Sequence, residues 1–252
     1  MYRPRIIPVL LLKDGGLVKT VQFKNPRYIG DPINAVRIFN DLDADELAFL
    51  DIDATRQHRL VSIDIVKNVG EEANMPFSVG GGIRTLDDIH KIIEAGAEKV
   101  IITTRAVEDP GFIKQAVKEF GSSTIVVCID IAKNFWGKLV VWSRAGKKPA
   151  VYAPVEFANM MEEYGAGELI IQSIKRDGKM EGYDIDLIRS ISQRVTIPIV
   201  ALGGAGNMQH LRDLEQQAVV NGLGAGSMFV YHGERNAVLV NYPEREVLRT
   251  ND

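Results

Sequence analysis

Four turns that directly follow short apolar runs are the clearest candidates for chemistry, and that chemistry is anion binding. Glycines in such turns let backbone N–H groups approach an anion closely, and a helix that begins after the turn adds the positive end of its dipole. Gly82 with Thr104 would form one phosphate site, and Gly204 with Gly226 and Ser227 a second. The residues expected to bind phosphate from these turns are Gly81, Gly82, Thr103, Thr104, Gly203, Gly204, Gly226 and Ser227. The alternative is that the glycines only terminate strands.

Aspartates follow several apolar runs as well. Asp130 comes directly after one run, and Asp177 and Gly178 follow another after a short loop. An acid at the C-terminal end of a barrel strand is typical of catalysis or substrate binding. This position favours a catalytic Asp130 and places Asp177 and Gly178 in the phosphate-binding set. Aspartate is also common at helix caps and in turns, so the roles of Asp51 and Asp53 stay open.

The sequence offers no pattern for a metal or a cofactor. The four histidines show no HExxH or similar ligand spacing, so we expect neither a metal nor another cofactor. They are His58, His90, His210 and His232. The single cysteine, Cys128, lies inside an apolar run without a partner signature, which favours a buried inert thiol.

The elements that must position these residues form an alternating pattern. Eight short apolar runs suit strands buried on both faces, and amphipathic stretches such as 86–94 and 112–120 between them suit helices. The runs are 6–12, 47–50, 76–79, 100–102, 124–129, 169–171, 197–202 and 219–223. Eight strand–helix units of about 31 residues each predict an α/β fold, a (βα)8 TIM barrel, in one domain over residues 1–252.

The two halves of the chain resemble each other. Ala44-Asp45-Glu46-Leu47 is similar to Ala166-Gly167-Glu168-Leu169, 122 residues later (44 to 166). Pro76 with Gly81-Gly82 is similar to Pro198 with Gly203-Gly204 at the same spacing (76 to 198). A duplicated (βα)4 half-barrel is the simplest explanation.

Composition and charge exclude several classes of protein. The net charge of −3 and pI near 5.9 argue against nucleic-acid binding, and one cysteine rules out a disulfide framework. No apolar run approaches the ~18 residues of a membrane span. The N-terminal run 6–12 is short, contains Pro8 and lacks a cleavage site, so we interpret it as a buried strand and expect a cytoplasmic protein.

At this point the motifs resemble a known family, the cyclase subunit of imidazole glycerol phosphate synthase (HisF type). The similarity covers nearly the full length. It rests on Arg5-Ile6-Ile7-Pro8, Lys13-Asp14-Gly15, Gly30-Asp31-Pro32, Leu50-Asp51-Ile52, Val79-Gly80-Gly81-Gly82-Ile83-Arg84, Arg176-Asp177-Gly178, Gly182-Tyr183-Asp184 and Gly203-Gly204-Ala205-Gly206-Asn207. The resemblance implies a half-duplicated barrel with two phosphate sites. It also implies a HisH-type glutaminase partner, whose ammonia travels through the barrel to a phosphate-bearing substrate.

Family roles transfer to matching positions. The charged ring at the family's ammonia entrance matches Arg5, Glu46, Lys99 and Glu168. Lys19 lies in the loop that the family uses as a lid over substrate, and the second catalytic carboxylate matches Asp130. The resemblance therefore implies catalytic roles for Lys19 and Asp130.

The first catalytic carboxylate is absent. The family reads Pro-Cys-Leu-Asp where this chain reads Pro8-Val9-Leu10-Leu11, and Leu11 cannot transfer a proton. Thr103 replaces an asparagine, and Gln172 replaces a threonine. A general acid or base contributes typically ~10²- to 10⁴-fold in rate, so these changes predict compromised cyclase chemistry behind a retained ammonia entrance.

A group of HisF-like paralogues from surface-sugar gene clusters is the closer resemblance. The run from Leu10 to Val21 and the tail Phe229-Val230-Tyr231-His232-Gly233 are similar to them. That resemblance implies ammonia supply for amidination of an N-acetylated sugar, with a separate sugar amidotransferase as a further partner. The alternatives are a true cyclase of histidine biosynthesis with an altered acid–base pair, and a scaffold that only docks and activates the glutaminase.

Overall fold

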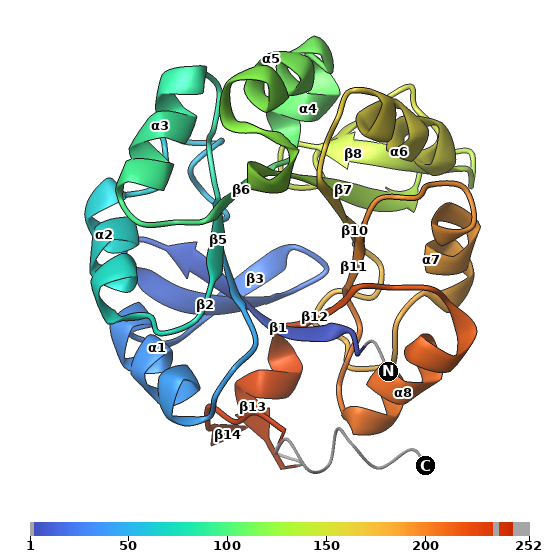
Figure 1. The fold of residues 1–252 in the computed structure, drawn as a ribbon. Coiled ribbons are helices and arrows are strands. Elements are labelled where there is room, and N and C mark those ends of the chain that lie inside the picture. Colours follow the sequence, from blue (N-terminus) through green and yellow to red (C-terminus); the bar gives the residue numbers. More distant parts are fainter. Residues whose placement is uncertain (1–2, 234–236, 244–252) are drawn as a thin grey trace.

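Eight parallel strands close into a barrel (Figure 1). The computed structural model describes residues 3–233 and 237–243. Neighbouring strands pair in parallel around the whole ring, and the pairs of β1 with β12 and of β7 with β10 complete the closure. In order around the barrel, the strands are β1 (Arg5–Lys13), β4 (Leu47–Asp51), β5 (Phe77–Gly80), β6 (Lys99–Ile102), β7 (Ile125–Lys133), β10 (Glu168–Ser173), β11 (Ile199–Leu202) and β12 (Gly222–Ala225). The predicted TIM barrel is confirmed.

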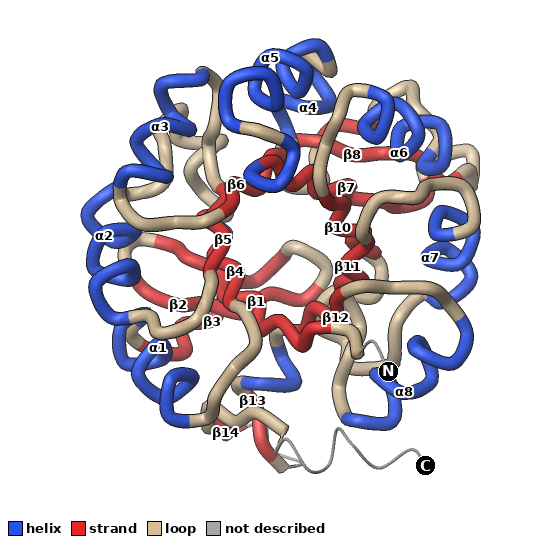
Figure 2. Tube along the Cα trace, in the orientation of Figure 1, coloured by secondary structure: helices blue, strands red, loops and turns tan. Residues whose placement is uncertain are grey.

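Helices surround the strands (Figure 2). They are α1 (Pro32–Asp41), α2 (Ile63–Glu72), α3 (Leu86–Glu94), α4 (Thr104–Glu108), α5 (Gly111–Phe120), α6 (Pro154–Glu163), α7 (Ile185–Ser192) and α8 (Met208–Gln217). Local sequence explains where they begin, because the side chains of Asp31, Ser62, Thr85, Asp184 and Asn207 accept backbone hydrogen bonds as N-caps. None of the helices in the described part of the chain has the length and apolarity needed to cross a membrane.

Strand alternation decides which side chains fill the barrel. Every second residue of a strand points inward, and these residues form a cluster separate from the core between strands and helices. Its members are Ile7, Val9, Ala48, Ile101, Val126, Cys128, Ile170, Val200 and Leu202, with Leu11 and Leu50 packed against them. The middle of the barrel is therefore aliphatic, and this interior cluster contains no aromatic side chain.

The interior-facing positions on β12 are glycines. A Cβ on Gly222 would lie 2.8 Å from Val200 Cγ2 and 3.0 Å from Ile7 Cδ1. These two neighbours already fill the space that a side chain at position 222 would need. The large side chains on the adjacent strands therefore require glycine on β12.

Hydrogen bonds at the strand starts repeat between the two halves. Leu47 N donates to Pro76 O at 3.0 Å, and Leu169 N donates to Pro198 O at 2.9 Å, 122 residues later (47 to 169). This agreement in three dimensions supports the half-barrel duplication.

The structure also differs from the expected regular eightfold repeat. The last strand starts at Gly222 rather than at 219, because Val219 is exposed in the preceding loop. β7 does not end at Asp130 but continues to Lys133 and pairs with β8 (Leu139–Ser143), which pairs with β9 (Lys148–Pro149). Two helices, α4 and α5, follow β6, and a 3₁₀ turn (Ser227–Phe229) follows β12.

Two further hairpins were not expected. β2 (Gly16–Val21) and β3 (Lys24–Gly30) form an antiparallel extension of β1, and β13 (Tyr231–His232) pairs with β14 (Ala237–Val238). The first of these hairpins carries Lys19, so the lid expected from family resemblance is here a regular two-stranded element.

The capping box of α3 gives a test of the local folding argument. Thr85 Oγ1 accepts from Asp88 N at 3.1 Å, and Asp88 Oδ2 accepts from Thr85 N at 2.9 Å. We expect Thr85→Ala to lower the free energy of unfolding by about 1 kcal/mol. Ser123→Ala, at an exposed residue, should change it by less than about 0.5 kcal/mol. Denaturant unfolding measures both, and equal effects would contradict the capping argument.

Candidate functional site

Four charged side chains form a ring at the N-terminal end of the barrel. Arg5 makes ion pairs with both Glu46 and Glu168, and Lys99 Nζ lies 3.1 Å from Glu46 Oε1 and 3.3 Å from Glu168 Oε2. The residues start β1, β6 and β10 or directly precede β4, so strand alternation turns them inward beneath the aliphatic interior cluster. The structure brings together all four residues predicted to line the entrance.

The electrostatics of this ring are balanced. Two cations alternate with two carboxylates, and both glutamates are buried. Burial alone would lower the pKa of Arg5, but the charges and hydrogen bonds of Glu168 and Glu46 outweigh it and raise that pKa above its usual value. Each carboxylate is paired with two cations, so no charge of the ring is left uncompensated at this end of the barrel.

Asp130 lies at the opposite end of the same interior. It follows Val126 and Cys128 in the inward-facing row of β7, and it is 6% exposed. The pKa of Asp130 is raised to about 7, mainly by burial. The hydrogen bond from Cys128 acts in the opposite direction, and the charge of Asp177 raises the pKa further. Cys128 Sγ donates to Asp130 Oδ1 at 3.7 Å, and burial also raises the pKa of this thiol well above its usual value. Cys128 is a protonated buried thiol, as the sequence indicated.

Gln172 is the immediate neighbour of Asp130. The two residues are register partners on β10 and β7, and Gln172 is 4% exposed. Its Nε2 donates to Asp177 Oδ1 at 3.5 Å, while its Oε1 is buried without a hydrogen-bond partner among the described residues. Among the described residues, Gln172 Oε1 is the one buried side-chain acceptor without a hydrogen-bond partner.

Leu11 lies across the barrel from Asp130. β1 and β7 are four strands apart in either direction around the closed ring, and Leu11 continues the inward row of Arg5, Ile7 and Val9. It packs against the interior cluster and is the register partner of Leu50 on β4. The C-terminal mouth therefore has an apolar side chain, Leu11, on the wall opposite Asp130.

Lys19 is buried above this mouth. Its Nζ donates to Val9 O at 2.7 Å, and a Cβ on Gly226 would lie only 2.4 Å from it. Burial lowers the pKa of Lys19 to about 8, with Asp177 acting in the opposite direction. A buried amine near Asp177 and the last barrel strand is suited to proton transfer or to binding an anion close to neutral pH.

Asp177 fastens the β2–β3 hairpin over the barrel. Its Oδ2 accepts from Thr20 Oγ1 at 3.0 Å and from Phe23 N at 3.2 Å, and its carbonyl accepts from Gln22 N at 3.0 Å. A Cβ on Gly178 would lie 2.1 Å from Thr20 O. Asp177 and Gly178 thus hold the lid closed. Sequence analysis missed the partners Thr20, Gln22 and Phe23, since they carry no motif of their own.

The predicted phosphate turns are tightly packed against neighbouring loops. A Cβ on Gly82 would lie 1.9 Å from Arg59 O, and one on Gly204 would lie 2.1 Å from Gly182 O. Both glycines have positive φ, of 71° and 113°. Glycine is therefore required by backbone conformation and close approach at both turns. Their phosphate binding stays a prediction.

The hydroxyl-bearing turns lie at the same ends of the strands. Thr103 and Thr104 follow β6 at the start of α4, where Thr104 Oγ1 accepts from Arg144 N at 3.1 Å. Gly226 and Ser227 follow β12, and Ser227 is buried. Because the strands are parallel, all these turns lie on the face that carries Asp130.

Asp51 and Asp53 serve ion pairs and loop structure. Asp53 Oδ2 lies 2.8 Å from Lys13 Nζ and 2.9 Å from Arg56 Nη2, and the hydrogen bond from Lys13 lowers its pKa most. Asp51 accepts from Arg59 Nη1 at 2.6 Å and from the backbone N–H groups of residues 53 and 54. These contacts hold the loop whose Arg59 carbonyl touches Gly82.

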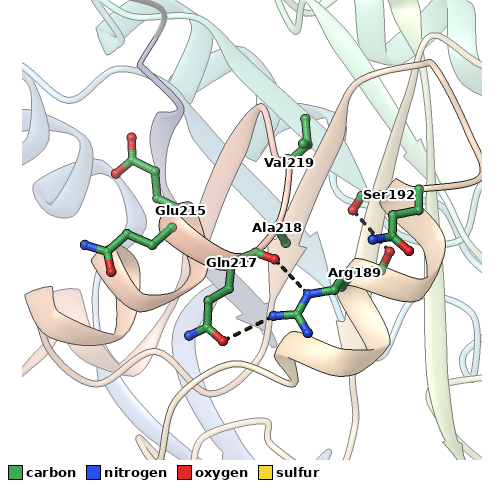
Figure 3. A pocket seen from close by; sticks show the side chains of 8 residues that line it. Arg189, Ser192, Glu215, Gln217, Ala218 and Val219 are labelled. Carbon is green, nitrogen blue, oxygen red and sulfur yellow. Dashed lines mark hydrogen bonds between the residues drawn. The ribbon is translucent and has the colours of Figure 1, made fainter.

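Other parts of the described chain lack comparable chemistry. No three His, Cys, Asp or Glu side chains within residues 3–233 and 237–243 gather as metal ligands. A surface hollow lies where α7 and α8 end, and there Arg189 bonds to Gln217 (Figure 3). It contains none of the predicted site residues.

The raised pKa of Asp130 predicts a pH-dependent stability. The pKa of the Asp130 carboxyl is near 4 in the unfolded chain and about 7 in the folded protein. The contribution of this group to the free energy of unfolding is therefore complete below about pH 4 and is lost by about pH 7. Asn at this position is neutral throughout. We expect Asp130→Asn to gain stability relative to the unmodified chain between these pH values, by on the order of 2–4 kcal/mol, and then to level off.

Denaturant unfolding at a series of pH values measures this difference. Asp41→Asn, at an exposed position, is the matched control and should show no such trend. A stability difference for Asp130→Asn that does not change with pH would contradict the burial of a neutral carboxyl.

Comparison with known proteins agrees with this architecture. The family model described as histidine biosynthesis protein matches residues 5–236. A Pseudomonas aeruginosa protein, provisionally named imidazole glycerol phosphate synthase subunit hisF2, is 46% identical over 97% of both chains. The imidazole glycerol phosphate synthase subunit HisF of Streptococcus mutans is 39% identical over 92% of both. The chain therefore belongs to the histidine biosynthesis protein family as a HisF-type subunit.

Proposed function

We propose that the chain is the ammonia-conducting barrel of a glutamine amidotransferase system. It receives ammonia from a HisH-type glutaminase and passes it on for amidination of an N-acetylated sugar in surface polysaccharide biosynthesis. The observation that carries the proposal is the complete four-charge ring at one end of a barrel whose other end holds Leu11 opposite Asp130.

The interior supports passage of a small neutral molecule. Above the ring, the inward-facing residues are Ile, Val, Ala, Leu and Cys side chains without an aromatic plug. An ammonium ion would lose its hydration there at a high free-energy cost, whereas neutral ammonia would not. An aliphatic interior thus favours neutral ammonia over ammonium as the species that would move.

The C-terminal mouth supports a changed chemistry. Cyclisation of the histidine-pathway nucleotide in this family uses proton transfers by two carboxylates, and Leu11 supplies none. Asp130 and Lys19 remain as proposed catalytic groups, with pKa values near 7 and 8 that suit proton transfer. With Leu11 opposite Asp130 the family's pair of opposed carboxylates is incomplete, whereas Asp130 and Lys19 suffice to orient and exchange protons with an ammonia-derived group.

The turns around the mouth would hold the acceptor. We assign phosphate binding to Gly81, Gly82, Thr103, Thr104, Asp177, Gly178, Gly203, Gly204, Gly226 and Ser227. Two of these residues would act indirectly, because the carboxylate of Asp177 does not attract a phosphate. Asp177 and Gly178 would contribute by holding the β2–β3 hairpin over the mouth. A cytoplasmic sugar amidotransferase docked at this face would take over the ammonia, with the glutaminase at the opposite face.

The runner-up is a cyclase subunit of imidazole glycerol phosphate synthase. It is supported by the relatives, whose names give this activity, and by the retained Asp130. Gene neighbourhoods for histidine synthesis would favour the runner-up, and those for sugar modification would favour the proposed role.

A cyclase assay separates these two functions. We expect the purified chain, given an ammonium salt and the histidine-pathway nucleotide, to show negligible turnover, at least ~10²-fold below an ordinary cyclase subunit. Leu11→Asp should restore a trace of activity, with Thr103 and Gln172 keeping it low. Leu11→Asn, which places a side chain of the same size but without a carboxyl group at this position, should restore none. Robust turnover by the unmodified chain would overturn the proposed function and establish the runner-up.

The ring predicts a specific coupling defect. Lys99→Ala leaves Glu46 and Glu168 with Arg5 as their only remaining cation in the ring, so the entrance becomes unbalanced. In complex with a glutaminase subunit, we expect more glutamine hydrolysed per ammonia transferred. Lys67→Ala, an exposed lysine on α2, is the control. Unchanged coupling in Lys99→Ala would show that the ring is not an ammonia entrance.

A further inference from the structure

The C-terminal segment returns to the N-terminal end of the barrel. Leu239 N donates to Val230 O at 3.0 Å, and Asn241 N donates to Phe229 O at 2.9 Å. These bonds direct Tyr242 into the core, where it is 8% exposed and its ring packs against Phe39 and Phe229. Burial raises the pKa of this phenol, so Tyr242 keeps its hydroxyl proton at neutral pH.

The hydroxyl of Tyr242 joins two strands beside the charged ring. It donates to Ile6 O at 3.0 Å and accepts from Asp45 N at 3.1 Å. Asp45 Oδ2 in turn accepts from Ile6 N at 2.9 Å. Ile6 directly follows Arg5 and Asp45 directly precedes Glu46, so the hydroxyl fixes the backbone next to two of the four ring residues.

The duplicated half shows what this contact replaces. Gly167 corresponds to Asp45 at the 122-residue spacing (45 to 167), and it precedes Glu168 as Asp45 precedes Glu46. Gly167 N donates to a backbone carbonyl, that of Ile125, at 3.0 Å. The equivalent donor in the first half, Asp45 N, is instead bonded to the Tyr242 hydroxyl. A side chain from the tail has thus taken the place of a backbone anchor beside one ring glutamate.

We propose that Tyr242 is a positioning residue for the four-charge ring. Its hydroxyl holds the start of β1 and the residue before Glu46 in register, so that Arg5 meets Glu46 and Glu168 while Lys99 closes the other side. Tyr242 touches neither ammonia nor substrate in this role. The inference rests on the proposed function for its biological meaning, since the ring is the proposed ammonia entrance, but the geometry of the ring is testable without any partner.

Tyr242→Phe isolates the hydroxyl because it retains the aromatic packing. Tyr183→Phe is the matched control: Tyr183 is 4% exposed and its hydroxyl donates to a carbonyl, Gly224 O, at 2.9 Å, nearer the C-terminal end of the barrel. Brief acylation of the folded chain with a limiting amine-reactive reagent, read by mass spectrometry, reports how firmly the Lys99 amine is held. The exposed Lys67 serves as internal reference.

We expect Lys99 to be acylated about threefold to tenfold faster in Tyr242→Phe, as the loss of one or two hydrogen bonds would allow. Its rate in Tyr183→Phe should equal that of the unmodified chain, although both variants unfold at somewhat lower denaturant concentrations. An unchanged Lys99 rate in Tyr242→Phe would overturn the inference, as would an equal acceleration in Tyr183→Phe. If Tyr242→Phe does not fold, Asp45→Ala removes the acceptor of Ile6 N and should accelerate Lys99 labelling in the same way.

A second measurement separates this inference from the proposed function. With a glutaminase subunit present, Tyr242→Phe should raise the ratio of glutamine hydrolysed to ammonia transferred in the same direction as Lys99→Ala. Faster Lys99 labelling with coupling intact in both variants would support the positioning role and overturn the ammonia entrance. If Lys99→Ala loses coupling while Lys99 labelling is unchanged in Tyr242→Phe, the result would support the ammonia entrance and overturn the positioning role of Tyr242.

Discussion

The closure of eight parallel strands into a barrel is the constraint on which the rest of the structure depends. Closure turns every second residue of each strand toward a shared interior, so one row on β1 carries Arg5, Ile7, Val9 and Leu11 from one end to the other. The same alternation arranges the inward-facing residues in layers. Charged residues lie at the strand starts, aliphatic residues in the middle, and the residues around Asp130 at the strand ends. Because the strands are parallel, chemistry at strand starts and chemistry at strand ends are separated by the full length of the interior.

The two ends of that interior differ in what they retain. At the strand starts, two cations and two carboxylates compensate one another, which makes burial of the charges tolerable. At the strand ends, Leu11 lies opposite Asp130, and burial raises the pKa of that carboxyl to about 7. The lid hairpin closes this end through Asp177, and the tail secures the other through Tyr242. A complete charged ring at one end, with a leucine opposite Asp130 at the other, is the reason why we propose a conducting barrel rather than a cyclase.

Much of this architecture was predictable from the sequence because it depends on local patterns. Apolar runs located the barrel strands, and the amphipathic stretches 86–94 and 112–120 located two helices. Family resemblance brought the four ring residues together across 163 positions of chain (5 to 168). The β2–β3 hairpin was missed because β3 is largely exposed and lacks an apolar run, and the β13–β14 hairpin because each of its strands has two residues. The end of β7 was misplaced because Asp130 was interpreted as the residue that ends the strand. The contacts of Thr20 and Tyr242 depend on tertiary packing, which no local sequence pattern predicts. The glycine turns were located correctly, but close backbone contacts account for their glycines without a ligand.

The central claim is that ammonia made by a glutaminase travels inside this barrel to a sugar acceptor. The most direct test is a reconstituted system with glutamine carrying ¹⁵N in its amide, an excess of unlabelled ammonium, an N-acetylated sugar with its amidotransferase, and ATP to activate the amide oxygen as the leaving group. Mass spectrometry of the product gives the isotope ratio of the transferred nitrogen. We expect an amidine enriched in ¹⁵N far above the ratio in bulk solution. An amidine with the bulk ratio would contradict conduction through the barrel, and no amidine at all would contradict the proposed acceptor.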